Sequence, residues 1–119
     1  MIVIGREKTR TDAAAEYVRA HAAGSTVATK LCDFSSLADV RRLAEDLLST
    51  LPRLDVLVNN AGLWHPQRTL SKDGIEDTLA VNHLAPFLLT NLLLPKLKET
   101  GAARIVNVSS RLHEKQTAF

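Results

Sequence analysis

The chain has 119 residues, of which 45% are hydrophobic and 24% are charged, an ordinary balance for a globular protein. Its 15 basic and 13 acidic residues give a formal net charge of +2, and the basic residues are spread along the chain. This distribution argues against nucleic acid or an anionic membrane surface as the main partner. The single cysteine, Cys32, excludes an internal disulfide, and the four histidines show no metal-ligand spacing, so no metal is expected.

The N-terminus shows only a short apolar run and no basic residue before it, so we find no targeting signal. The longest apolar stretch, 84–94, is interrupted by Pro86, Thr90 and Asn91. We expect it to be too short and too polar to span a bilayer. The sequence therefore predicts a cytoplasmic protein, with membrane association only if an anchor precedes Met1.

Strand and helix patterns alternate in the first half of the chain. Residues 1–4 are apolar and β-branched and end at Gly5, which predicts a strand. The alanine-rich segment 11–22 predicts a helix, with Gly24 as its stop signal. Residues 26–32 predict the second strand, which contains Cys32 as a small buried apolar residue.

A second helix is expected over 37–48, where Ser36 and Asp39 form a loose capping box at its start. One face of this helix is apolar: Leu37, Val40, Leu43, Ala44, Leu47 and Leu48. Residues 54–59 form a nearly continuous apolar run, which is typical of a buried parallel strand.

A polar loop of about residues 60–73 leads into a long helix and a fourth strand. Residues 75–98 are helical in composition, with a break or bend expected near Asn82 to Pro86. Residues 104–109 predict the fourth strand. Four strands separated by helices indicate an α/β protein with a mostly parallel sheet, and we expect one partial domain over 1–119.

Ligands of open parallel sheets bind beyond the carboxyl ends of the strands, so the residues there are candidates. The first strand ends at Arg6, whose guanidinium can pair with a 2′-phosphate on an adenosine ribose or lie solvated on the surface. The second strand ends at Asp33, which can accept a hydrogen bond from an adenine amino group or begin the next helix.

The third strand ends in Asn59-Asn60-Ala61-Gly62, where small residues let a flat ligand approach the backbone and the amides can tie the loop to its neighbours. The alternative is a simple turn rich in Asn and Gly. Asn82, in an apolar stretch, is either a satisfied amide at a helix bend or the holder of a proton-relay water. A hydroxyl at the end of the fourth strand, Ser109 or Ser110, can donate to a substrate carbonyl during hydride transfer.

The order and spacing of Asn59-Asn60-Ala61-Gly62, Val81-Asn82-His83 and Arg104 to Ser110 resemble the classical short-chain dehydrogenase/reductase family. The sequence around these motifs is similar to the retinol dehydrogenase-like branch, including the WW-domain oxidoreductase group. The resemblance implies a partial Rossmann-type doubly wound parallel sheet. It also implies an NAD(P)-dependent oxidoreductase acting on a lipophilic carbonyl or alcohol such as a retinoid or steroid, with NADP preferred over NAD. Classical members often pair, which suggests a homodimer through the helix 86–98.

The resemblance also implies roles for individual residues. Asn82 would hold the relay water and Ser110 would position the substrate carbonyl, so these are the expected catalytic residues. The expected cofactor-binding residues are Arg6, Asp33, Phe34, Asn60, Ala61, Gly62, Val81 and Val108. Asp33 and Phe34 would flank the adenine, and Arg6 would favour NADP. Val108 would lie against the nicotinamide.

Two parts of the family pattern are missing from these 119 residues. The glycine-rich turn that cradles the pyrophosphate belongs before Met1, and the catalytic Tyr-x-x-x-Lys belongs beyond Phe119. The family's first strand would lie between the strands 1–4 and 54–59, so we expect a gap, two unpaired edges and a chain prone to aggregate. The isolated chain is expected to be inactive. The alternative is a non-catalytic dehydrogenase-like binding protein or a truncated isoform.

Overall fold

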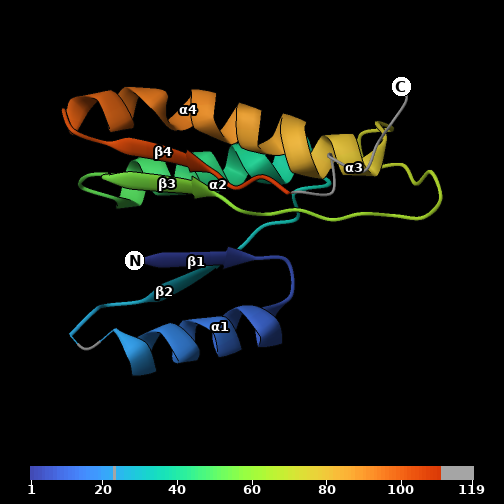
Figure 1. Cartoon of the computed structure of the whole chain (residues 1–119). Helices are drawn as coiled ribbons and strands as arrows, with labels where there is room; N and C mark the ends of the chain where they lie inside the picture. Colours follow the sequence, from blue (N-terminus) through green and yellow to red (C-terminus); the bar gives the residue numbers. More distant parts are fainter. Residues whose placement is uncertain (23, 111–119) are drawn as a thin grey trace.

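Strands and helices alternate in the computed structural model, which describes residues 1–22 and 24–110 (Figure 1). The strands are β1 (Ile2–Gly5), β2 (Ala28–Leu31), β3 (Val56–Asn59) and β4 (Arg104–Asn107). The helices are α1 (Lys8–His21), α2 (Leu37–Thr50), α3 (Asp77–Leu79) and α4 (Ala85–Glu99), and a π-helical turn, Ala80–Leu84, joins α3 to α4. The expected alternation of strands and helices is confirmed.

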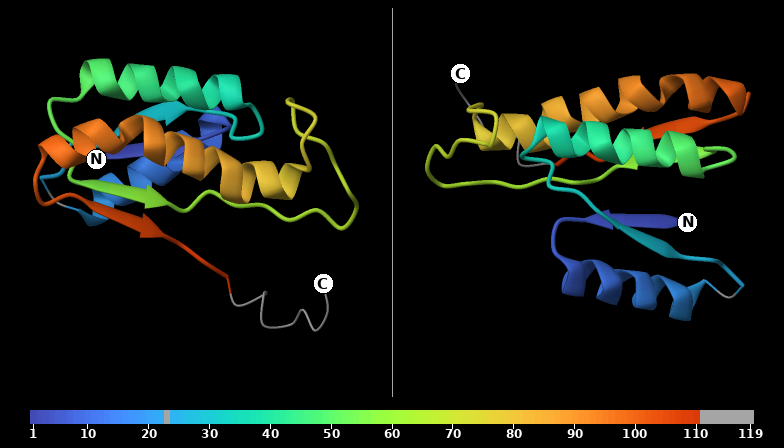
Figure 2. Two further views of the ribbon diagram at one scale, coloured as in Figure 1. Left: turned by 90° about the horizontal axis from the view of Figure 1, so that it is seen from above. Right: turned by 180° about the vertical axis from the view of Figure 1, so that it is seen from behind.

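The strands form two separate parallel pairs, β1 with β2 and β3 with β4. Within the described residues no ladder joins β1 to β3, and a cavity of about 410 Å³ lies between them, lined by Ile2, Ile4 and Leu57 among others. The expected gap is therefore confirmed (Figure 2). The radius of gyration is 15.4 Å, larger than the roughly 13.5 Å expected for a closed domain of this length.

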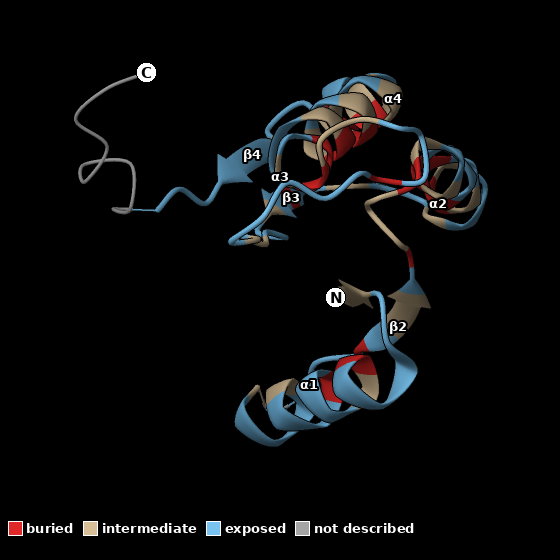
Figure 3. Cartoon of the chain, turned by 90° about the vertical axis from the view of Figure 1, so that its right-hand side faces the viewer, coloured by how far each residue is buried: buried red, intermediate tan, exposed pale blue. Residues whose placement is uncertain are grey.

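The helices cover the two strand pairs on different sides. Helix α1 packs against β1 and β2, whereas α4 lies over one face of the β3–β4 pair and α2 lies beside α4 (Figures 1 and 3). The main core lies between α2, α4 and β3, and it consists of Cys32, Val40, Leu43, Ala44, Leu47, Leu57, Ala85, Leu89, Leu93 and Leu97. Four of the six apolar α2 positions predicted from the sequence are fully buried there, which confirms that face of the helix.

Helix α1 begins at Lys8, three residues before the start predicted from the sequence. The Glu7 carboxylate accepts hydrogen bonds from the backbone N–H groups of Thr9 (2.8 Å) and Arg10 (2.9 Å) and so caps the first turn. These bonds lower the pKa of Glu7. Helix α2 is capped as the sequence predicts, because Ser36 Oγ accepts from the N–H of Asp39 at 3.2 Å.

Gly5 lets α1 approach the end of β1 closely. A Cβ atom at this position would lie 2.2 Å from the Oγ1 atom of Thr11 in α1, which no real Cβ contact tolerates. Thr11 is itself 4% exposed, so the clash could not be relieved at the surface. The glycine at the end of the first strand is thus a packing requirement.

The expectation that the third strand is buried on both sides is wrong. Leu57 is 7% exposed beneath the helices, but Val56 and Val58 are 50% and 53% exposed on the opposite face. Val106 and Val108 are 43% and 55% exposed. The reason is that α2 and α4 cover only the Leu57 side, and no described residue covers the other.

The helical segment Asp77–Thr100 has 24 residues and is long and apolar enough to cross a bilayer by length and composition. On that measure our expectation from the sequence was wrong. Its Leu89, Leu93 and Leu97 nevertheless lie in the core beside α2, at 3%, 0% and 4% exposure. These residues form one packed face of the helix, and 28% of its most apolar stretch is buried in all.

We predict that the open edge of β3 makes the chain self-associate. Replacing Val58 with lysine should lower the aggregated fraction severalfold, because a charge on an exposed strand edge opposes pairing with another copy. Tyr17→Lys is the matched control, since Tyr17 is 67% exposed but lies on α1 away from any strand edge. Sedimentation velocity at several concentrations measures the effect. Equal aggregation of the two variants would contradict the prediction.

Candidate cofactor site

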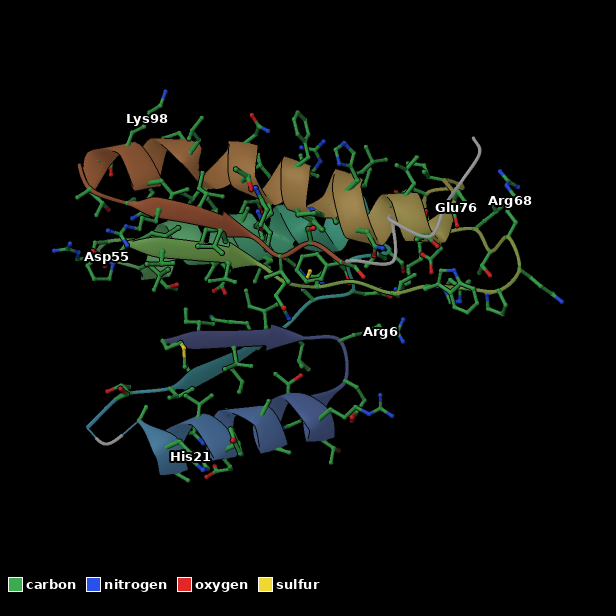
Figure 4. All side chains as sticks on the ribbon, in the orientation of Figure 1. Arg6, His21, Asp55, Arg68, Glu76 and Lys98 are labelled. Carbon is green, nitrogen blue, oxygen red and sulfur yellow. The ribbon has the colours of Figure 1, made fainter. Side chains whose placement is uncertain are left out.

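Six of the eight predicted cofactor-binding residues line one cavity of about 290 Å³, which we call the β1–β2 cavity. It lies at the carboxyl ends of β1 and β2, beside the start of the loop that follows β3 (Figure 4). Its lining residues are Ile4, Gly5, Arg6, Cys32, Asp33, Phe34, Ala61, Gly62, Leu63 and Val81. Parallel strands bring their carboxyl ends to one edge, which is why residues so distant in sequence meet here.

Arg6 is exposed on the rim of this cavity and is uncommitted. It makes no ion pair with any acidic side chain in the described part of the chain. Figure 4 shows Arg6 at the end of β1, toward the same end of the molecule as Glu76 and Arg68 and opposite the end with Asp55 and Lys98. Its guanidinium is therefore available to an anion entering from the solvent.

Asp33 is held by three hydrogen bonds. Its Oδ1 atom accepts from the N–H (3.0 Å) and the hydroxyl (2.8 Å) of Ser35, and its Oδ2 atom lies 3.0 Å from Lys72 Nζ. Burial opposes ionisation of this carboxyl, but the hydrogen bonds from Lys72 and Ser35 prevail and lower its pKa. The cap of α2 is Ser36, so Asp33 shapes the turn before the helix and does not cap it.

Cys32 lies in the wall of the cavity and is 3% exposed. Burial raises the pKa of its thiol to about 11. The thiol is therefore protonated at neutral pH and is a poor nucleophile, which confirms the interpretation of Cys32 as a small apolar core residue.

Asn59 ties β3 to both of its neighbours. Its Nδ2 atom donates to Thr90 Oγ1 on α4 at 3.1 Å and to Asn107 Oδ1 on β4 at 2.8 Å. Of the two asparagines expected to tie the loop to its neighbours, Asn59 makes such contacts. The next residue, Asn60, is exposed and lines the 410 Å³ cavity between β1 and β3.

Asn82 lies in the π-helical turn, where a bend was predicted. Its Oδ1 atom accepts from the N–H of Leu63 and its Nδ2 atom donates to the carbonyl of Leu63, both at 2.8 Å. The Asn82 side-chain amide therefore supplies a hydrogen-bond partner to both the N–H and the carbonyl of Leu63. A Cβ at Gly62 would meet Asn82 Oδ1 at 3.6 Å, an ordinary contact, so protein packing does not require glycine there.

A third cavity, of about 460 Å³, brings Asn82 together with Val108 and with Phe87 of α4. Ala61 lines both this cavity and the β1–β2 cavity, so the loop after β3 contributes to both. Ser110 is exposed, two residues beyond Val108.

The contacts made by the polar loop were not predicted from the sequence. Lys72 reaches Asp33, and His65 Nε2 lies 2.9 Å from Asp77 Oδ2. Asp77 is 6% exposed, and its Oδ1 atom is buried without a hydrogen-bond partner among the residues that the structure describes. No periodic pattern marks a loop, so the sequence carries no signal for these pairs.

A family model described as short chain dehydrogenase matches residues 1–119. The chain belongs to this family. It is 52% identical over 85 residues to mouse retinol dehydrogenase 14, covering 71% of this chain and 25% of that protein. It is 38% identical over 113 residues to human retinol dehydrogenase 13, covering 95% of this chain and 34% of that protein. The chain thus spans a quarter to a third of these relatives, and the resemblance to the retinol dehydrogenase-like branch is confirmed.

Solved structures agree with the fold. A metagenomic short-chain oxidoreductase in complex with NADP superimposes with a TM-score of 0.76 at 29% identity, over 92% of this chain and 50% of that one. A short-chain dehydrogenase from Sphingobium yanoikuyae in complex with NADPH gives a TM-score of 0.75 at 27% identity, over 93% of this chain and 44% of that one. The described strands and helices are therefore part of a Rossmann-type fold.

We predict that Asn82 stabilises the chain through Leu63. Asn82→Ala should lower the free energy of unfolding by about 1–2 kcal/mol, because two hydrogen bonds to a partly exposed backbone are lost. Asn82→Asp keeps the acceptor for the Leu63 N–H but places a carboxylate oxygen against the Leu63 carbonyl, so it should restore little of the lost stability. Urea unfolding and hydrogen exchange of the Leu63 amide measure these effects.

His83→Ala is the control, since His83 is a neighbouring exposed residue with no hydrogen bond to the loop. If Asn82→Ala leaves the Leu63 amide as protected as in the natural chain, the two contacts do not form in solution.

Proposed function

We propose that this chain forms the adenosine-binding region and part of the nicotinamide region of an NADP-dependent short-chain dehydrogenase. The enzyme would interconvert a lipophilic alcohol and its carbonyl, such as a retinoid or a steroid. The observation that carries the proposal is the convergence of Arg6, Asp33, Phe34, Ala61, Gly62 and Val81 on one cavity. The NADP and NADPH bound in similar structures support the choice of cofactor.

At the adenosine end, the residues supply complementary chemistry. Arg6 is a free guanidinium at the rim and suits the 2′-phosphate that distinguishes NADP from NAD. Asp33 offers acceptors for the adenine amino group, and Phe34 offers an apolar surface for the ring. Protein packing does not require a glycine at position 62. Close approach of the ligand to the backbone of Gly62 would explain why the residue has no side chain.

At the nicotinamide end, we propose that Val108 lies against the ring and that Ser110 donates its hydroxyl to the substrate carbonyl. The cofactor supplies the hydride when bound. A hydroxyl donor at the carbonyl oxygen favours the charge that develops there during transfer. Asn82 keeps one N–H and one lone pair beyond its bonds to Leu63, which are sufficient to hold a relay water.

The apolar side chains Phe87, Ile105 and Val108 in the 460 Å³ cavity favour a lipophilic substrate, as do relatives named for retinol.

We also propose that two copies pair through the outer face of α4, where Phe87 is 62% exposed. A cytoplasmic location, with membrane association through a preceding anchor, completes the proposal.

Arg6 provides the test of the cofactor. Arg6→Asp should weaken binding of adenosine 2′,5′-bisphosphate by roughly 10-fold or more, because a charge-assisted pair contributes about 1.5–3 kcal/mol. Binding of 5′-AMP, which lacks the 2′-phosphate, should change far less. Isothermal titration calorimetry on the chain measures both affinities.

Arg68→Asp is the matched control, because Arg68 is an exposed arginine that does not line the cavity. An unchanged preference for the bisphosphate in Arg6→Asp would remove Arg6 from the cofactor site. If the natural chain binds neither nucleotide, the proposed site itself is wrong.

A further inference from the structure

Residues 69–77 form a tight hairpin, which we call the strap, in the loop between β3 and α3. The N–H of Ser71 donates to the carbonyl of Ile75 at 2.7 Å, and the N–H of Asp77 donates to the carbonyl of Thr69 at 2.9 Å. Gly74 has a φ of +73°, a left-handed conformation that lets the hairpin reverse. Ser71 is 8% exposed and its Oγ accepts from the N–H of Ile75. The strap is therefore an ordered turn with its own hydrogen bonds.

The strap is fastened to the connection between β2 and α2 by three contacts. Lys72 Nζ lies 3.0 Å from Asp33 Oδ2, and the N–H of Lys72 donates to the carbonyl of Ser35 at 3.0 Å. The N–H of Leu37 donates to Asp73 Oδ2 at 2.7 Å. Since Asp33 lines the β1–β2 cavity, the strap carries a lysine ammonium to the carboxylate at the wall of that cavity.

The Lys72 contact changes what Asp33 can do. Ser35 fixes the Oδ1 atom, and without Lys72 the Oδ2 atom could rotate away or take up a proton. The ammonium holds Oδ2 in place, and this hydrogen bond raises the pKa of Lys72 while it helps to lower that of Asp33. An ionised and fixed carboxylate is the form that accepts a hydrogen bond from an amino group.

We propose that Lys72 is a positioning residue that holds Asp33 ready to accept the adenine amino group. This inference rests on the proposed function, in which adenosine lies in this cavity. Lys72 acts through Asp33 and not by touching the ribose phosphates, so its effect is the same for nucleotides with and without a 2′-phosphate. Its side chain is 62% exposed, so solvent screens the pair and the effect is moderate.

The experiment measures the affinity of the chain for adenosine 2′,5′-bisphosphate and for 5′-AMP by calorimetry, with circular dichroism to check folding. Lys72→Met should weaken both nucleotides by about fivefold, the scale of a screened ion pair. Lys72→Arg keeps the charge and should restore affinity to within about twofold. Lys98→Met is the matched control, because Lys98 is an exposed lysine on α4 at the opposite end of the molecule (Figure 4).

Two further readouts separate positioning from a structural role. In the Asp33→Asn background, Lys72→Met should cause no additional loss, because a residue that acts through Asp33 has nothing left to hold. A carbon-detected NMR titration of the Asp33 carboxyl should show a higher pKa in Lys72→Met than in the natural chain. The result in the Asp33→Asn background does not follow if Lys72 only stabilises the loop, and the pKa shift shows that the Lys72–Asp33 pair forms in solution.

The possible outcomes are distinguishable. If the natural chain binds nucleotide and Lys72→Met binds equally well, the role of Lys72 is refuted and the proposed function stands. A loss confined to the bisphosphate would mean direct contact with the 2′-phosphate, and a loss that persists in the Asp33→Asn background would mean a role that does not act through Asp33. Either result would overturn the inference. If the natural chain binds neither nucleotide, the proposed function fails and the inference fails with it.

Discussion

The parallel arrangement of the strands is the constraint on which the rest of the structure depends. Each helix returns the chain to the same end, so every strand finishes at one edge of the molecule. Residues as far apart as Arg6, Asp33 and Gly62 therefore line one cavity, although nothing in their local sequence links them. The direction of the strands therefore determines which residues meet at the site, and the side chains of those residues then determine its chemistry.

Much of this arrangement could be predicted because it depends on local patterns. The apolar face of α2 and its Ser36 cap follow from the sequence, as does the bend at Asn82. The predicted cofactor residues followed from the family motifs at the strand ends. The burial of β3 could not be predicted, because a run such as Val56 to Val58 looks the same whether one face or both are covered. The early start of α1 was missed because glutamate is an uncommon cap, and only the geometry shows that Glu7 reaches two N–H groups.

The contacts of the loop after β3 could not be predicted from the sequence, for a different reason. Its contacts join side chains that are far apart in sequence, such as Lys72 with Asp33 and Asp73 with the N–H of Leu37. Loops carry no periodicity, and a lysine in a polar stretch is most often solvated. Such partners follow from where the loop lies, and that depends on the packing of the whole chain.

The β1–β2 cavity also depends on how the two strand pairs are held relative to each other. One wall comes from β1 and the end of β2, and the other comes from the loop after β3, yet no ladder joins the pairs within the described residues. Apolar contacts of Ile2, Ile4 and Phe34 with the main core provide one link. The polar contacts of the strap to the β2–α2 connection provide another. Because these links are few, a strand placed between β1 and β3 would add a ladder on each side and fix the width of the cavity. A strand that completed the sheet would therefore also shape the cavity in which we propose that the cofactor binds.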